Sequence, residues 1–136
     1  MPQTVADVMG DVKVRMSPDA TLRGLASELS AARTGLAIVE ETGGAGVISE
    51  RDVLRAIAAG ADLDSARVGE HMTPNPVTVP ATTPLADACD LMISRSVRHL
   101  LVSDGSGLVG VLNMRDVVGV LSGAADLGSV PPAREV

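Results

Sequence analysis

The second half of the chain repeats the first half, and this duplication limits the folds open to it more than any other feature. Met9 matches Met72, 63 positions later, and Asp52 matches Asp116, 64 positions later, so one residue has been gained in a turn. Two copies are too few for a solenoid, in which repeats form a continuous stack. We therefore expect two homologous halves that pack face to face about a pseudo-twofold axis and line a shared cleft. The matching segments are 5–9 with 68–72, 22–29 with 85–92, 35–39 with 97–102, and 47–53 with 111–117.

Each copy is predicted to fold in the order strand, helix, strand, strand, helix. Residues 12–16 alternate apolar and polar side chains, as a half-buried strand does. The apolar residues of 22–29 recur at i, i+3, i+4 and i+7, which is the spacing of one helix face, and this helix should end near Gly35. Short strands are expected at 36–39 and 46–49. The helix that follows, from 49 to 60, should turn inward the side chains Val53, Leu54, Ile57 and Ala58.

The second copy repeats this order, with elements expected at 77–79, 83–95, 97–102, 108–112 and 113–122. A short helix capped by Thr4 and reaching Met9 should open the first copy. These elements predict a mixed α/β (α+β) fold with repeat 1 at residues 1–66 and repeat 2 at residues 67–123. Residues 124–136, which are rich in Gly and Pro, are predicted to form a flexible tail.

The composition disfavours several classes of function. Phe, Tyr and Trp are absent although 46% of the residues are hydrophobic, so the core must be aliphatic and no aromatic surface can stack nucleic-acid bases. The net charge of −6 makes DNA and anionic membranes poor partners. No apolar run approaches the ~20 residues that span a bilayer, and the first residues lack the regions of a signal peptide. The sequence therefore predicts a cytoplasmic protein with neither a nucleic-acid nor a membrane partner.

The second copy also carries a set of motifs in a fixed order. They are Met72-Thr73-Pro74, the Val-x-Val pair Val77 and Val79, the helical positions Leu85, Ala88 and Met92, the segment 97–102, and the strand-to-helix junction 108–116. In this order and in duplicate, the motifs resemble a tandem pair of cystathionine-β-synthase (CBS) domains, often called a Bateman module. The resemblance covers residues 4–123.

This resemblance implies a β-α-β-β-α fold for each copy, pseudo-twofold pairing, and a homodimer of two such modules. It also implies an adenosine-containing ligand (AMP, ADP, ATP or S-adenosylmethionine) in the cleft between the copies, with no cofactor required. In such domains a Ser/Thr-x-x-Asp motif at the last strand-to-helix junction holds the ribose. Strand backbone of the opposite copy meets the adenine edge, and basic residues reach the phosphates. The regulated partner is expected to be another protein, whose identity stays open.

Two unequal ligand sites are predicted. The site with the better charge for a nucleotide has a carboxylate that can accept two hydrogen bonds from a diol, together with basic groups for phosphate. It comprises Asp116, Asn113, Arg98 and His99, completed by Val12, Lys13 and Val14. The other site keeps the complete Ser-x-x-Asp motif but has weaker phosphate contacts. It comprises Asp52 and Ser49 against Val77 and Thr78.

Other interpretations of these residues stay open. A Ser-x-x-acid pattern at a helix start is also a plain capping arrangement, and Asn is an equally good N-cap, although capping and binding can coexist. A ligand-free structural or dimerisation module is the alternative function. An enzyme is not expected, because the sequence shows no paired nucleophile and base and no Walker-type loop. A metal site is not expected either, since His71 has no companion ligand at metal spacing.

Overall fold

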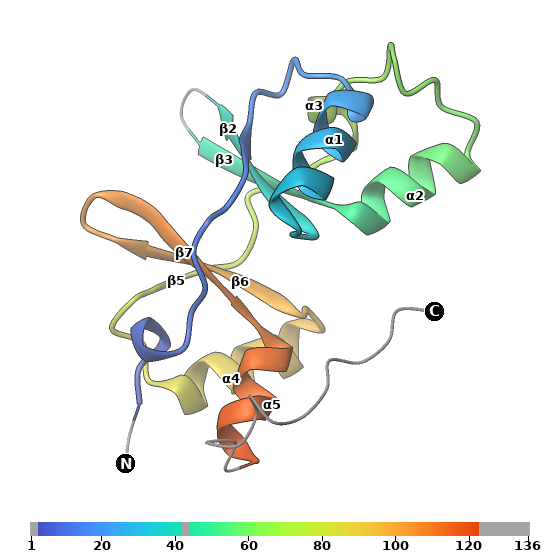
Figure 1. Cartoon of the computed structure of the whole chain (residues 1–136). Coiled ribbons are helices and arrows are strands. Elements are labelled where there is room, and N and C mark those ends of the chain that lie inside the picture. Colours follow the sequence, from blue (N-terminus) through green and yellow to red (C-terminus); the bar gives the residue numbers. More distant parts are fainter. Residues whose placement is uncertain (1–2, 42–43, 123–136) are drawn as a thin grey trace. The chain divides into compact units, whose positions relative to one another are not determined.

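The computed structural model describes residues 3–41 and 44–122, and Figure 1 shows the course of the chain. The chain forms two compact units. The first unit is Val12–Val77, and the second unit joins the described residues of Met1–Asp11 to those of Thr78–Val136. Each unit has its own β-sheet and its own helices.

The first unit has a four-stranded sheet in the order β1-β2-β3-β4, in which β1 is parallel to β2 and the other pairs are antiparallel. The expected order of strand, helix, strand, strand, helix is confirmed for the first repeat. The first strand is shorter than predicted, although the Val14 carbonyl still accepts from the Ile38 N–H at 3.0 Å. The elements are β1 (Arg15–Met16), α1 (Leu22–Ala32), β2 (Leu36–Glu41), β3 (Gly44–Ser49), α2 (Glu50–Ala58), α3 (Val68–His71) and β4 (Thr73–Pro74).

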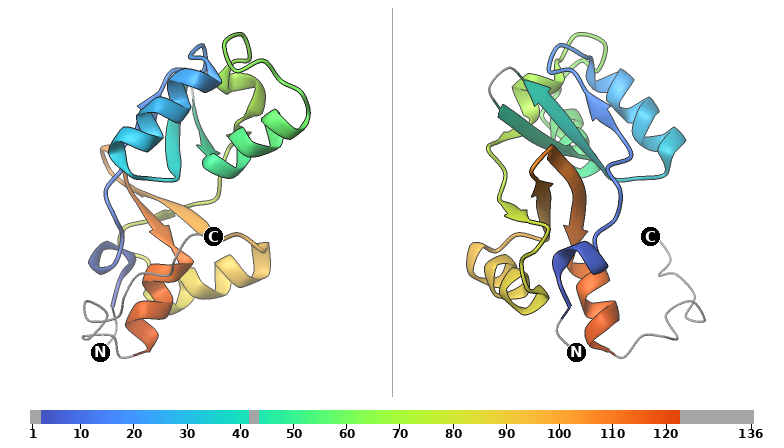
Figure 2. Two further views of the ribbon diagram at one scale, coloured as in Figure 1. Left: turned by 45° about the vertical axis from the view of Figure 1, so that its right-hand side comes forward. Right: turned by 90° about the vertical axis from the view of Figure 1, so that its left-hand side faces the viewer.

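The second unit has a three-stranded sheet in the order β5-β6-β7. β5 is parallel to β6, and β6 and β7 form an antiparallel hairpin. Figure 2 shows α4 and α5 beside this sheet. The predicted order of elements is confirmed here as well. The elements are the 3-10 helix η1 (Val5–Asp7), β5 (Thr78–Pro80), α4 (Leu85–Arg95), β6 (His99–Asp104), β7 (Gly107–Asn113) and α5 (Met114–Leu121).

The opening segment of each repeat belongs to the unit built by the other repeat, and this exchange was not predicted. α3 and β4 open the second repeat but dock in the first unit, where β4 pairs with β3. η1 opens the first repeat but docks in the second unit, where Gly10 bridges Val111. The two docking arrangements use equivalent backbone hydrogen bonds. In the first unit, backbone N–H groups donate to carbonyls from Val68 to Ala20, from Gly69 to Pro18 and from Leu22 to Ala66. In the second unit, the equivalent bonds run from Val5 to Thr83, from Ala6 to Ala81 and from Leu85 to Gln3, and all six are 2.8–3.0 Å long.

A methionine of each opening segment lies over a glycine of the hairpin on which the segment docks. A Cβ added to Gly46 would come 2.6 Å from the sulfur of Met72, and one added to Gly110 would come 2.5 Å from the sulfur of Met9. The added Cβ would also come 3.0 Å from the Thr73 carbonyl oxygen at Gly46 and 2.9 Å from the Gly10 carbonyl oxygen at Gly110, so the close approach favours glycine at both positions. The duplication has therefore preserved both the exchange and its steric requirement.

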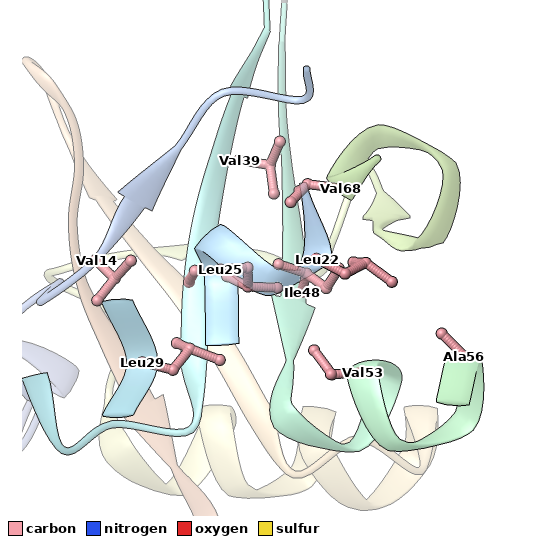
Figure 3. Packing of buried hydrophobic residues seen from close by; sticks show 10 residues of the cluster. Val14, Leu22, Leu25, Leu29, Val39, Ile48, Val53, Ala56 and Val68 are labelled. Carbon is pink, nitrogen blue, oxygen red and sulfur yellow. The ribbon is translucent and has the colours of Figure 1, made fainter. Parts of the chain in front are cut away.

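The core of the first unit is aliphatic, as the composition requires. Figure 3 shows Val68 of α3 among the core residues of α1, β2 and β3. Val68 and Leu22 are fully buried. A residue of the second repeat thus completes the core of the first unit.

The prediction for the buried face of α2 is wrong in part. Val53 and Ala56, one turn apart, are buried as a narrow contact face. Leu54 and Ile57, which were expected to point inward, are 65% and 49% exposed, and Ala58 is exposed as well. Leu54 and Ile57 each directly follow a buried residue, and adjacent helical positions lie about 100° apart around the axis, so two neighbours cannot face the same narrow contact.

Three expectations are left as predictions by the fold. The flexible tail at 124–136 lies outside the described residues. The pseudo-twofold arrangement of the repeats stays a prediction, and so do the repeat boundaries at 1–66 and 67–123.

Candidate functional site

The strand-to-helix junction of the second unit brings together the four residues predicted there. His99 at the start of β6 pairs in register with Asn113 at the end of β7. Asn113 is the N-cap of α5, so Asp116 lies in the first turn of that helix. The Met114 N–H donates to the Arg98 carbonyl at 2.9 Å, which holds the beginning of β6 against the beginning of α5.

The pKa of His99 reflects the charges and the burial at this junction. Shielding of part of its imidazole from water lowers the pKa of His99, and the positive charge of Arg98 lowers it further. The carboxylate of Asp116 acts in the opposite direction and raises the same pKa. The three side chains therefore form one electrostatic group, with two basic groups and one acidic group at the start of α5.

Asn113 caps α5 without a hydrogen bond to Asp116. Its Oδ1 accepts from the Arg115 N–H at 2.8 Å. Within the described residues, 3–41 and 44–122, the carboxylate of Asp116 takes part in no hydrogen bond or ion pair. Its two oxygens keep their full capacity to accept hydrogen bonds.

The equivalent junction of the first unit is organised differently. The Ser49 backbone N–H and hydroxyl both donate to Asp52 Oδ2, at 2.8 and 3.1 Å. The Asp52 N–H in turn donates to the Ser49 hydroxyl at 3.3 Å, which completes a capping box at the start of α2. The second oxygen, Oδ1, lies 3.8 Å from an Arg55 guanidinium nitrogen. The capping interpretation of the Ser-x-x-Asp motif therefore holds for Asp52.

Glu50 is a residue of this junction that the sequence analysis missed. Its N–H donates to the Gly35 carbonyl at 2.8 Å, which is the counterpart of the bond between Met114 and Arg98. Its carboxylate lies against Gly35, because a Cβ added to that glycine would come 3.0 Å from Glu50 Oε1. The signal for it was present in the repeat alignment, where Glu50 corresponds to the uncharged Met114 and Gly35 to Arg98.

The remaining predicted site residues lie at or just before the first strand of each repeat. Val12, Lys13 and Val14 belong to the first unit, immediately before β1. Val77 ends the first unit, and Thr78 begins β5, where it pairs with Leu101. Their predicted contribution to the Asp116 and Asp52 sites stays a prediction.

Among residues 3–41 and 44–122, no three His, Cys, Asp or Glu side chains are grouped as metal ligands would be. No helix in the same ranges is long and apolar enough to cross a membrane.

Two mixed α/β repeats, each with a capped helix directly after a β-hairpin, define a tandem-repeat module. The sequence pattern of the CBS domain matches the chain twice, at residues 5–59 and 68–123. The chain belongs to the CBS domain family.

The chain is similar to proteins of several organisms. Arabinose 5-phosphate isomerase KdsD of Yersinia pestis is 33% identical over 118 residues, which are 84% of this chain and 36% of the isomerase. The chain thus spans about a third of the length of that enzyme. An uncharacterised 17.7 kDa protein of Acidianus ambivalens is 31% identical over 89% of this chain and 74% of its own length. Among solved structures, CBS domain protein PAE2072 from Pyrobaculum aerophilum, complexed with AMP, has a TM-score of 0.76 and 31% identity over 91% of this chain and 99% of its own.

Proposed function

We propose that this chain is a regulatory module that binds an adenosine-containing ligand and signals its occupancy to a partner protein. The ligand class comprises AMP, ADP, ATP and S-adenosylmethionine. The observation that carries the proposal is the junction of the second unit, where Arg98, His99 and an unengaged Asp116 lie at the start of one helix. The similarity to a CBS domain protein complexed with AMP supports the same class of ligand.

The chemistry of the junction suits such a ligand. A carboxylate with both oxygens available can accept hydrogen bonds from the two vicinal hydroxyls of a ribose, and such charge-assisted bonds are stronger than neutral ones. Arg98 supplies positive charge for phosphate, and His99 adds to it when a bound phosphate favours its protonated form. The positive end of the α5 helix dipole favours an anion as well. S-adenosylmethionine shares the ribose but lacks the phosphate, so the basic residues favour a nucleotide over it.

Signalling requires that the ligand bind two conformations unequally, because a ligand with equal affinity for both shifts nothing. In this proposal the module performs no catalysis and acts in the cytoplasm. Its regulated partner is a separate functional unit, on another chain or elsewhere in a longer one.

Thermal or urea unfolding with a panel of adenosine compounds tests the proposal. A ligand present at about 100 times its dissociation constant should stabilise the folded chain by roughly 2.7 kcal/mol. Guanosine and cytidine nucleotides serve as controls for general anion binding and should have a smaller effect. No stabilisation by any adenosine compound, in protein shown by mass spectrometry to be free of nucleotide, would remove the ligand-binding function.

A specific observation also favours the dimerisation function. Leu54 and Ile57 of α2 are exposed, and so are Val118 and Leu121, which occupy the equivalent positions of α5. The chain thus presents the same apolar pair twice, one turn apart on each helix. A twofold interface uses one patch on both partners, so a second copy of this chain, which carries the same two pairs, is the partner that fits them best. We infer a homodimer through α2 and α5, which is compatible with ligand binding.

A further inference from the structure

The two strand-to-helix junctions are equivalent by repetition but differ in their side chains, among them His99 of the second unit, where the first unit has Leu36. The second unit has Arg98, Asn113 and Met114 where the first unit has Gly35, Ser49 and Glu50. The backbone of both junctions is the same, since the N–H of Met114 bonds to the Arg98 carbonyl as that of Glu50 bonds to the Gly35 carbonyl. Differences in binding must therefore arise from these side chains.

The first difference concerns the carboxylate. Ser49 draws Asp52 into a capping box in which Oδ2 accepts two hydrogen bonds, and Oδ1 faces Arg55. Asn113 instead caps α5 by itself, through the Arg115 N–H, and so leaves Asp116 unengaged. A ligand at Asp52 would have to compete with the helix cap, whereas a ligand at Asp116 would not.

The second difference concerns charge and space, and it is independent of the capping. The Glu50 carboxylate lies against Gly35, which is the position that Arg98 holds in the second unit. A negative group thus stands in the first unit where a positive group stands in the second. An anionic phosphate meets repulsion at the first junction and attraction at the second.

We propose that the chain binds one nucleotide rather than two, at the α5 junction, and that Asn113 and Glu50 are the residues that make the two junctions unequal. This inference rests on the proposed function and refines it. Asn113 acts as a positioning residue, because it keeps Asp116 out of the helix cap. Glu50 acts as a specificity residue that closes the α2 junction to phosphate.

Calorimetric titration of the full chain with AMP tests the stoichiometry. We expect one AMP per chain. Asp116→Asn should weaken binding roughly tenfold or more, while Asp52→Asn should leave the affinity for AMP within about twofold of that of the parent chain. A stoichiometry of two AMP per chain would overturn the inference and leave the proposed function standing. The same holds if one AMP binds and its binding is lost in Asp52→Asn but kept in Asp116→Asn. Absence of any AMP binding, together with no response to the other adenosine compounds, would instead remove the proposed function and this inference with it.

Exchanging residues between the junctions tests the roles of Asn113 and Glu50. The variant Asn113→Ser/Met114→Glu gives the second unit the pattern of the first and should lose AMP binding by roughly tenfold or more. The variant Ser49→Asn/Glu50→Met should gain a second, weaker AMP site. Urea unfolding without ligand measures an effect of Asn113 that does not depend on binding. Asn113→Ser alone should raise the urea midpoint, because Asp116 can then join a capping box. An unchanged or lowered midpoint, or unaltered AMP affinity in Asn113→Ser/Met114→Glu, would contradict the assignment.

Discussion

His99 couples the candidate site to pH, because its surroundings in the folded chain lower its pKa. Shielding from water and the charge of Arg98 place its pKa in the folded chain below the ordinary value of 6.5, with Asp116 opposing. The folded chain therefore holds fewer protons than the unfolded chain as the pH falls below about 6.5. The contribution of His99 to stability is fully present above that value and is lost as the pH falls through the folded pKa.

We expect the urea midpoint of the parent chain to fall more than that of His99→Gln when the pH is lowered from about 7.5 to about 5.5, across the histidine range. The comparison of the two proteins cancels the other groups that titrate in this window. AMP should reduce the difference, because a phosphate favours the protonated imidazole. Parallel pH profiles for the two proteins would show that neither shielding from water nor the charge of Arg98 lowers the pKa of His99 in the folded chain.

At the scale of elements, the exchanged opening segments are the main feature of the fold. Val68 is fully buried in the first unit, and Val5 is fully buried in the second. Each lies in a short helical segment that is too small to be stable alone and is held by its docking contacts. A substitution in one repeat should therefore act on the unit formed by the other.

Val68→Ala should cost about 2 kcal/mol of stability, through lost burial and the cavity left behind. In hydrogen-exchange mass spectrometry, α1, β2 and β3 should lose protection before α4 and β6 do. Val5→Ala should give the reverse order. Ala6→Asp, at an exposed position of the same segment, is the control and should change little. Loss of protection in α4 and β6 first, on changing Val68, would contradict the exchange.

At the scale of the whole molecule, the proposed homodimer rests on the exposed apolar pairs of α2 and α5. Most apolar side chains of the described residues are withdrawn from solvent, yet Leu54, Ile57, Val118 and Leu121 are about half or more exposed. Their repetition at equivalent positions separates them from Ile93 of α4, which is 70% exposed but whose repeat equivalent is Ser30.

Light scattering after size-exclusion chromatography should show a dimer for the parent chain and a monomer for Leu54→Glu/Val118→Glu, because burying two carboxylates in an apolar interface is costly. Ile93→Glu is the control, since it adds a carboxylate at a similarly exposed apolar position outside the proposed interface. A monomeric parent chain, or a dimer unaffected by the double change, would remove this interface.

The order of elements and the capped helices were predictable because they depend on local patterns. The apolar spacing within 22–29 and within 85–92 requires only neighbours three and four residues apart, and helices lie at both places. The inward face of α2 was predicted wrongly, because four apolar residues within two turns do not reveal which of them meets the sheet. Of the four, only Val53 is buried, and it is joined by Ala56, which was not predicted to face inward.

The candidate site was also predictable from the sequence only in part. The sequence placed Arg98, His99, Asn113 and Asp116 around one strand-to-helix junction, since a hairpin brings the start of one strand to the end of the next. The sequence could not show that Asp52 accepts hydrogen bonds in its helix cap while Asp116 does not. In both motifs an aspartate stands three residues after the N-cap residue, so the two patterns look alike. Nor did the sequence place Glu50 against Gly35.

The sequence by itself determined the duplication, the order of strands and helices in each copy, and the family, because these reside in residue types at short, regular spacings. The tertiary structure alone decided that the opening segments cross between the repeats, that Met9 and Met72 lie over Gly110 and Gly46, and which carboxylate is left unengaged. Those features depend on contacts between residues tens of positions apart. Such contacts are selected by burial and by the pairing of backbone groups in three dimensions, for which a linear pattern contains no direct signal.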